Sequence, residues 1–108
     1  MRTPKPGQPV RGSRSGRPIM TLLDLLGRRM ALRVLWELSV GGEPLTFRAL
    51  QERAETNPSV LNARLRELRA SRLVDHAGDG YQLTAEGRSL VDLVLPLHEW
   101  AERWASRS

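Results

Sequence analysis

The chain has 108 residues, with 17 Lys and Arg, 12 Asp and Glu, and no Cys. This length is typical of a single domain, which buries roughly two thirds of its unfolded surface and can hold one core. Without cysteine the chain cannot form disulfides, thiolate metal sites or thiol redox switches. No apolar stretch is long enough to span a membrane or to form a signal peptide. We therefore expect a cytoplasmic protein without a membrane partner.

The net charge of +5 is unevenly distributed along the chain. Residues 1–18 contain five basic side chains and no acid, and they are rich in Pro and Gly, so we predict a disordered basic arm. A basic arm of this kind could contact the backbone or the minor groove of a nucleic acid such as DNA. Alternatively, it could serve only as a solubilising tail. The predicted folded domain covers residues 19–105. Residues 19–72 hold three more basic than acidic side chains and residues 73–108 hold three fewer, so the charge of the body is polarised.

The first two predicted elements are helices. A short amphipathic helix follows Pro18 and ends near Gly27. A second helix starts near Arg28, and its apolar residues continue to Gly41 and Gly42, which are a strong stop signal.

A second pair of helices follows in the middle of the chain. A brief extended segment is expected at Leu45, and Thr46 can cap a short helix. Asn57 is a good N-cap, and Pro58 is a preferred residue of a first helical turn. Leucines then recur at three or four positions on one face, so we predict a helix over about 57–71. These leucines are Leu61, Leu65 and Leu68.

A hairpin and a long helix complete the prediction. Residues 73–76 and 81–84 alternate with a period of two around a Gly-Asp-Gly turn, which predicts a small β-hairpin. The last helix is predicted from Ala85 to about Ala105. Pro96 should kink this helix or divide it in two.

Two short helices joined by a short turn and followed by a hairpin are the plan of a winged helix-turn-helix, whose second helix enters the DNA major groove. The predicted fold class is therefore mostly α with a small β-hairpin. If the leucines of 57–71 face the core, the opposite face carries small and hydrogen-bonding residues that suit base edges. They could instead be ordinary solvated helix residues. The predicted base contacts are Ser59, Asn62, Ala63 and Arg66, and the predicted phosphate contacts are Arg48, Arg64 and Arg69.

Three stretches of the chain have a distinctive sequence: LLGRRMALRVLWEL (Leu25 to Leu38), PLTFRALQERAETNPSVLNARLRELRASRLV (Pro44 to Val74), and YQLTAEGRSL followed by HEWAERW (Tyr81 to Trp104). Over roughly residues 20–104 they resemble the HxlR-type winged-helix transcriptional regulators, within the broader class that includes the MarR and PadR types. The resemblance implies a small dimeric bacterial transcription factor without a catalytic centre, whose N- and C-terminal helices form the dimer interface. Glu55 and Thr56 stand where the family often has glycine, and the hairpin is shorter than the usual wing.

The last predicted helix carries an apolar stripe that a domain of this size does not easily cover alone. Pairing with a second copy would bury this stripe together with the first apolar helix. Alternatively, the tryptophans belong to the core of one chain, or they line a cleft with Trp36 for a small-molecule effector of unknown identity. The predicted homodimer contacts are Leu22, Leu26, Leu90, Val94, Leu97, Trp100 and Trp104.

No catalytic, cofactor or metal site is predicted. The chain has only two histidines, His76 and His98, and no motif places an acid pair or a nucleophile beside them. Asp75, His76 and Asp79 on the hairpin are of types that bind metals, but such a trio is far more often solvated.

The sequence thus predicts a sequence-specific transcriptional regulator that binds double-stranded DNA as a homodimer. The alternative is a winged-helix protein-interaction module that docks through its tryptophan-bearing last helix. An enzyme is not expected.

Overall fold

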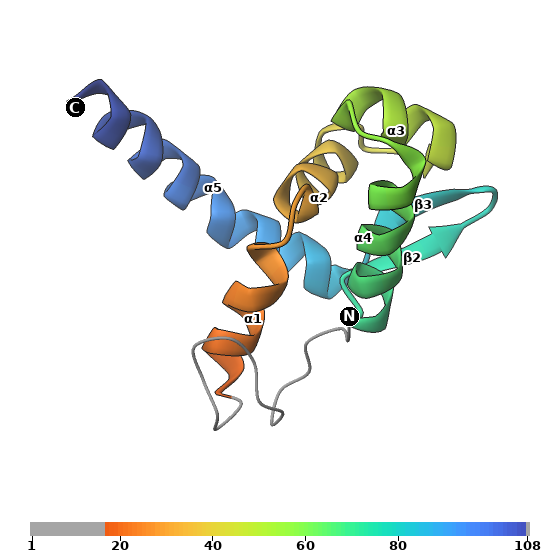
Figure 1. Ribbon diagram of the computed structural model, residues 1–108, viewed down its shortest axis with the longest axis horizontal. Helices are drawn as coiled ribbons and strands as arrows, with labels where there is room; N and C mark the ends of the chain where they lie inside the picture. The colour runs from red at the N-terminus through yellow and green to blue at the C-terminus, as the bar shows by residue number, and fades with distance from the viewer. Residues whose placement is uncertain (1–16, 108) are drawn as a thin grey trace.

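The computed structural model describes residues 17–107, so the predicted basic arm lies outside the described residues up to residue 16. Five helices and three short strands follow one another along this part of the chain (Figure 1). In chain order they are α1 (Pro18–Leu26), α2 (Ala31–Val40), β1 (Leu45–Thr46), α3 (Phe47–Ala54), α4 (Pro58–Ala70), β2 (Val74–Ala77), β3 (Gly80–Leu83) and α5 (Ala85–Ser106).

Helices α3 and α4 each begin at a residue whose side chain caps the first turn. The Thr46 hydroxyl accepts a hydrogen bond from the Ala49 amide at 3.1 Å, and the Asn57 side-chain oxygen accepts one from the Val60 amide at 2.9 Å. Each bond satisfies an amide that has no partner within its own first helical turn. The helix predicted over about 57–71 is confirmed as α4.

The strands form one antiparallel sheet in the order β1-β3-β2. The predicted hairpin is β2 and β3, with Val74 opposite Leu83 and Ala77 opposite Gly80. The extended segment expected at Leu45 pairs with Tyr81 and so adds a third strand. With its sheet and its helices the molecule is a winged helix-turn-helix, and the predicted fold class is confirmed.

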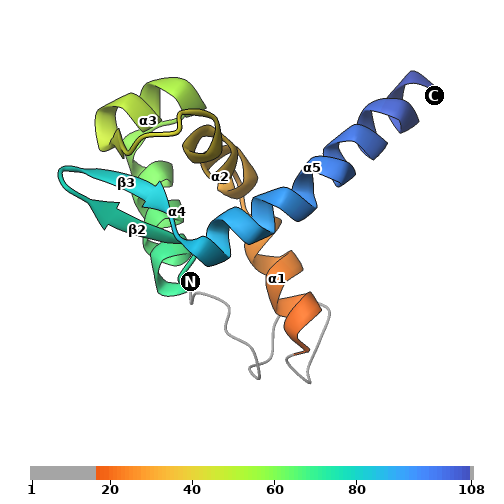
Figure 2. The same ribbon diagram turned by 180° about the vertical axis from the view of Figure 1, so that it is seen from behind.

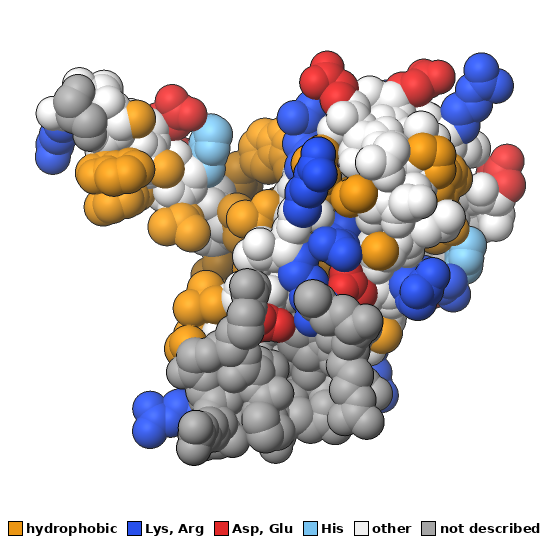
Figure 3. Space-filling model, viewed as in Figure 1, with side chains coloured by type: hydrophobic (Ala, Val, Ile, Leu, Met, Phe, Trp, Pro, Cys, Tyr) orange, Lys and Arg blue, Asp and Glu red, His pale blue; other side chains and the backbone are white. Residues whose placement is uncertain are grey.

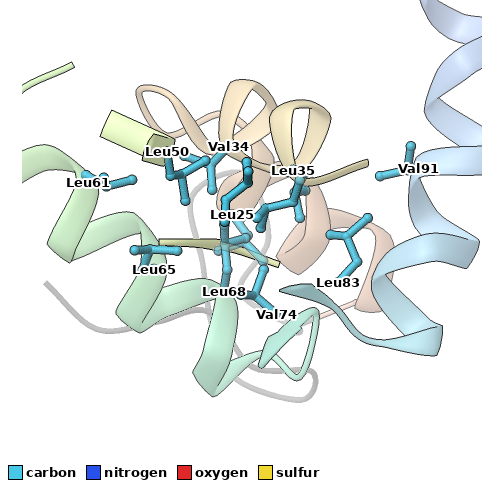
Figure 4. Close-up of a cluster of buried hydrophobic side chains, with 12 residues drawn as sticks. Leu25, Val34, Leu35, Leu50, Leu61, Leu65, Leu68, Val74, Leu83 and Val91 are labelled. Atoms are coloured by element: carbon cyan, nitrogen blue, oxygen red, sulfur yellow. The ribbon is translucent and has the colours of Figure 1, made fainter. Parts of the chain in front are cut away.

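One hydrophobic core holds these elements together. Leucines of α2, α3 and α4 point toward one another, and Val91 of α5 lies at the edge of the cluster (Figure 4). The side chains buried in this core are Leu25, Val34, Leu35, Leu38, Leu45, Leu50, Leu61, Leu65, Leu68, Val74, Leu83 and Val91.

Helix α5 leaves the core after Val91 and is exposed along its second half. In both views its C-terminal end and the hairpin lie on opposite sides of the molecule, and α1 projects in a third direction (Figures 1 and 2). Of the two expected effects of Pro96, a kink or a division, the division is wrong, because the helix continues through this residue. Pro96 removes the hydrogen bond to the carbonyl of Asp92, but both residues are exposed, so water can satisfy that carbonyl.

Within residues 17–107, no helix has the length and apolar composition needed to cross a membrane.

Candidate nucleic-acid interface

Helices α3 and α4 are joined by a tight turn of residues 55–57. Glu55 has φ 53° and ψ 48°, the left-handed conformation that usually favours glycine. Its amide donates to the Glu52 carbonyl at 3.3 Å, and the Thr56 amide donates to the Gln51 carbonyl at 3.4 Å. These bonds close the end of α3 and set the direction in which α4 begins.

Helix α4 has two chemically different faces. Leu61, Leu65 and Leu68 are buried in the core. On the other face Ser59, Asn62, Arg66 and Arg69 are exposed, and Ala63 is half-buried beside them. The four predicted base contacts therefore lie together on a face that is open to a large partner.

The predicted phosphate contacts do not share one environment. Arg48 is 91% exposed and lies 3.6 Å from Glu52 one turn further along α3. Arg69 is also exposed, near the end of α4. Both guanidinium groups are therefore accessible to a DNA backbone.

Arg64 differs from the other two. Its side chain is only 17% exposed, and its Nε atom lies 2.7 Å from Oε1 of Glu67, outside hydrogen-bond geometry. Its Nη1 atom donates to the Arg29 carbonyl at 3.3 Å. The predicted phosphate contact of Arg64 conflicts with this position, because the guanidinium is already engaged inside the protein.

Glu67 is a charged residue of α4 that the sequence analysis did not single out. It is 6% exposed and accepts a hydrogen bond from Arg28 in the turn after α1. Helical spacing gave no signal for this burial, because at about 100° per residue Glu67 lies roughly a third of a turn away from the middle of the leucine face.

The hairpin that forms the wing carries little positive charge. The rings of His76 and Tyr81 are tilted against each other by 34° with centroids 4.5 Å apart, and both residues lie on the strands rather than at the tip. The tip, residues 77–80, contains Asp79 and no Lys or Arg. Among the residues described, His, Asp and Glu form no group of three that could hold a metal ion.

A second surface is apolar and lies on the helices that leave the body. Hydrophobic side chains line α5 and α1 on the sides that face each other (Figure 3). Of the predicted dimer contacts, Leu97, Trp100 and Trp104 are between 53% and 61% exposed. The alternative that these tryptophans form the core of one chain is therefore wrong. The remaining predicted contacts, Leu22, Leu26, Leu90 and Val94, are half-buried.

The apolar surface is larger than the sequence indicated. Leu93 is 71% exposed, and it continues the stripe of Leu97 and Trp100 at helical spacing. On α1 the exposed apolar residues are Ile19 and Leu23, which the prediction did not include. The helical spacing of Leu93 and Leu97 on α5 was the signal that could have added Leu93 to the predicted contacts.

A cavity of about 490 Å³ lies between α2 and α5. Trp36 and Val94 line it from the two helices, and the rings of Trp36 and His98 are 5.8 Å apart at its wall. The predicted cleft is therefore present at Trp36 but is not the one formed with the tryptophans of the last helix. Trp100 and Trp104 do not line it; they stack on each other 5.9 Å apart.

Comparison with known proteins gives two positive findings. The sequence model of the HxlR-like helix-turn-helix family matches residues 25–108. Among solved structures, the chain is similar to the quinone-bound YodB from B. subtilis, with a TM-score of 0.73 and 25% sequence identity over 80% of this chain and 97% of that one. Curated proteins gave no match. The chain belongs to the HxlR-like helix-turn-helix family.

Proposed function

We propose that this HxlR-like helix-turn-helix regulator binds double-stranded DNA sequence-specifically as a homodimer, with α4 in the major groove. The observation that carries the proposal is the division of α4 into a buried leucine face and an exposed polar face. An Asn amide such as that of Asn62 can pair with adenine, and the fork of Arg66 can pair with guanine. Ser59 can bond to either kind of base edge, and Ala63 allows close approach.

The exposed apolar stripe on α5 and α1 supports the dimer. A contiguous apolar surface on a small domain marks an interaction site, and α1 and α5 present such surfaces toward each other (Figure 3). A second copy bound there would place two α4 helices on one DNA duplex. Their half-sites should then lie roughly 34 Å apart, about one helical turn, on a near-palindrome.

The test begins with genomic selection of bound DNA fragments, which gives both the sequence and its half-site symmetry. Binding of the selected DNA is then measured by fluorescence anisotropy. Arg66→Ala should weaken it by about 1–3 kcal/mol. Arg107→Ala, which removes an exposed arginine at the far end of α5, is the matched control. Equal affinity of wild type and Arg66→Ala would remove Arg66 from the base contacts.

The second candidate function is a protein-interaction module. The stacked and exposed Trp100 and Trp104 favour it, since tryptophan is enriched at the centres of protein interfaces. Binding to mixed genomic DNA across a salt series separates the two functions. No affinity even at low salt would contradict the DNA-binding function and support the module.

We also propose that the cavity between α2 and α5 receives a small aromatic effector. The YodB structure holds a quinone. In the present chain a ligand could not be held through a thiol, because there is no cysteine. Naphthoquinone is a suitable probe, and Trp36→Leu should reduce both its binding and any effect that it has on DNA affinity.

The remaining predictions follow from the regulator function. A regulator of this class meets chromosomal DNA in the cytoplasm, where we place the protein. The family is one of transcription regulators rather than enzymes, and we propose no catalytic role. Residues 1–16 lie outside the described residues, and their contact with DNA stays a prediction.

A further inference from the structure

Four charged side chains meet beneath α4, at the junction of α1 and the core. Arg28 lies in the turn after α1, and its Nη2 atom is 3.4 Å from Oδ2 of Asp24 on α1. The other terminal nitrogen of Arg28 donates to Oε2 of Glu67 on α4, while Oε1 of Glu67 lies 2.7 Å from Nε of Arg64. The side chains of Asp24, Arg28 and Glu67 are 7–8% exposed.

This cluster joins the two functional parts of the molecule. On α4, Arg64 and Glu67 lie next in sequence to Ala63 and Arg66, which face outward toward the proposed DNA site. On the other side, Asp24 and Arg28 flank Leu26, a proposed dimer contact. The Arg29 carbonyl, which accepts from Arg64, adds a further bond between the turn and α4.

A buried charge cluster of this kind is better suited to fixing the position of α4 than to raising the stability of the fold. Removing charges from water is unfavourable, and a buried ion pair seldom stabilises a fold more than apolar residues of the same size. Unlike apolar contacts, however, hydrogen-bonded ions have a narrow range of distances and directions. One oxygen of Glu67 faces Arg64 on the same helix and the other accepts from Arg28 in the turn after α1, so a shift of α4 against α1 would separate Glu67 from Arg28.

We propose that Glu67 is a positioning residue: held between Arg28 and Arg64, it fixes the recognition helix relative to α1 and so sets the half-site separation that the dimer accepts. The proposal rests on the proposed function, because only a dimer on DNA has a half-site separation. Adding one base pair rotates the second half-site by roughly a tenth of a turn. A rigid link between α1 and α4 would make the dimer sensitive to that rotation.

The test compares wild type, Glu67→Gln and Glu43→Gln. Glu43 is exposed in the loop before β1. Glu43→Gln makes the same chemical change as Glu67→Gln, but at the protein surface, and so serves as the control. Fluorescence anisotropy measures the binding of each protein to a single half-site and to a series of paired half-sites. In that series the separation between the two half-sites increases in steps of one base pair. Wild type and Glu43→Gln should prefer one separation by about tenfold or more over its neighbours, since the protein must bend or twist DNA to fit the others.

Glu67→Gln should reduce that preference to about threefold or less, while its affinity for a single half-site stays within about twofold of wild type. An unchanged preference for one separation would overturn the proposal. So would a parallel loss of affinity for the single and paired sites together with a lower melting temperature, because Glu67 would then act only on stability.

A second variant covers the case in which Glu67→Gln does not fold. Arg28→Lys keeps the positive charge but loses the second nitrogen that reaches Asp24, and it should broaden the accepted separations in the same way. Retention of a single preferred separation by this variant would contradict the proposal. Wild type that binds no DNA at any salt concentration would instead contradict the proposed function, and this inference with it.

Discussion

Gly87 lies so close to the carbonyl group of Leu73 that a Cβ atom on residue 87 would stand 2.1 Å from the Leu73 oxygen. The same oxygen accepts a hydrogen bond from the Thr84 amide at 3.0 Å. The Thr84 hydroxyl in turn accepts from the Gly87 amide at 3.0 Å. These hydrogen bonds hold the first turn of α5 against the segment that leads into β2. Only glycine at position 87 allows so close an approach.

Gly87→Ala should therefore destabilise the protein, although alanine is the better helix former. Overpacking of this kind costs about 1–3 kcal/mol, and here the obstacle is backbone rather than a flexible side chain. Chemical denaturation measures the change. Gly41→Ala is the control: its added Cβ would have no neighbour within 3.6 Å, so its effect should lie between zero and about 1 kcal/mol of stabilisation. A Gly87→Ala protein as stable as wild type would contradict the packing described.

In contrast to Gly87→Ala, the substitution Glu55→Gly should stabilise the protein. A left-handed conformation costs an L-residue about 1–2 kcal/mol, and Glu55 adopts one at the end of α3. Part of that gain is lost because glycine is more flexible in the unfolded chain, so Glu55→Gly should stabilise by about 0.5–1 kcal/mol. Thermal unfolding should show a higher melting temperature.

The control for this prediction is Glu55→Ala, which removes the same charge but keeps the Cβ atom. It should give no such rise. If both variants raised the melting temperature equally, the cause would be the lost carboxylate rather than the backbone.

Local signals predicted the helices of this fold well. The caps at Thr46 and Asn57 depend on amides three residues ahead, and both helices begin where the sequence indicated. The hairpin likewise depends on neighbouring segments. The pairing of Leu45 with Tyr81 brings together distant residues, and for this reason only a short extended segment could be predicted there.

The candidate site was predicted in part. The outward direction of Asn62 and Arg66 follows from the leucine face on the same helix, so helical periodicity was sufficient. The position of Arg64 depends on a carbonyl group 35 residues away, and that of Glu67 on an arginine 39 residues away. Helical spacing carries no information about such partners, so the partly buried position of Arg64 could not be predicted, and its phosphate contact stays a prediction.

The exposed stripe of α5 gives a prediction about assembly. Leu97 is 61% exposed, so Leu97→Lys should leave the fold intact but place a charge in the proposed dimer contact. We expect a shift from dimer to monomer in sedimentation equilibrium. Val40→Lys is matched to it, because Val40 is 60% exposed at the end of α2, away from the stripe, and should leave the mass unchanged. A dimer that is equally stable in both variants would exclude Leu97 from the interface.

The exposed arginines outside the base-contact set predict the salt dependence of DNA binding. Each phosphate contact releases condensed counterions, so Arg48→Ala and Arg69→Ala should each lower the slope of log K against log salt by about 1. Both are predicted to contact phosphates rather than bases, so affinity should fall by similar factors for specific and mixed DNA. Arg107→Ala should change neither quantity, since Arg107 lies at the end of α5, remote from α4. A loss of affinity for the specific site alone would instead assign Arg48 or Arg69 to base contacts and would extend the reading surface beyond the face of Asn62 and Arg66.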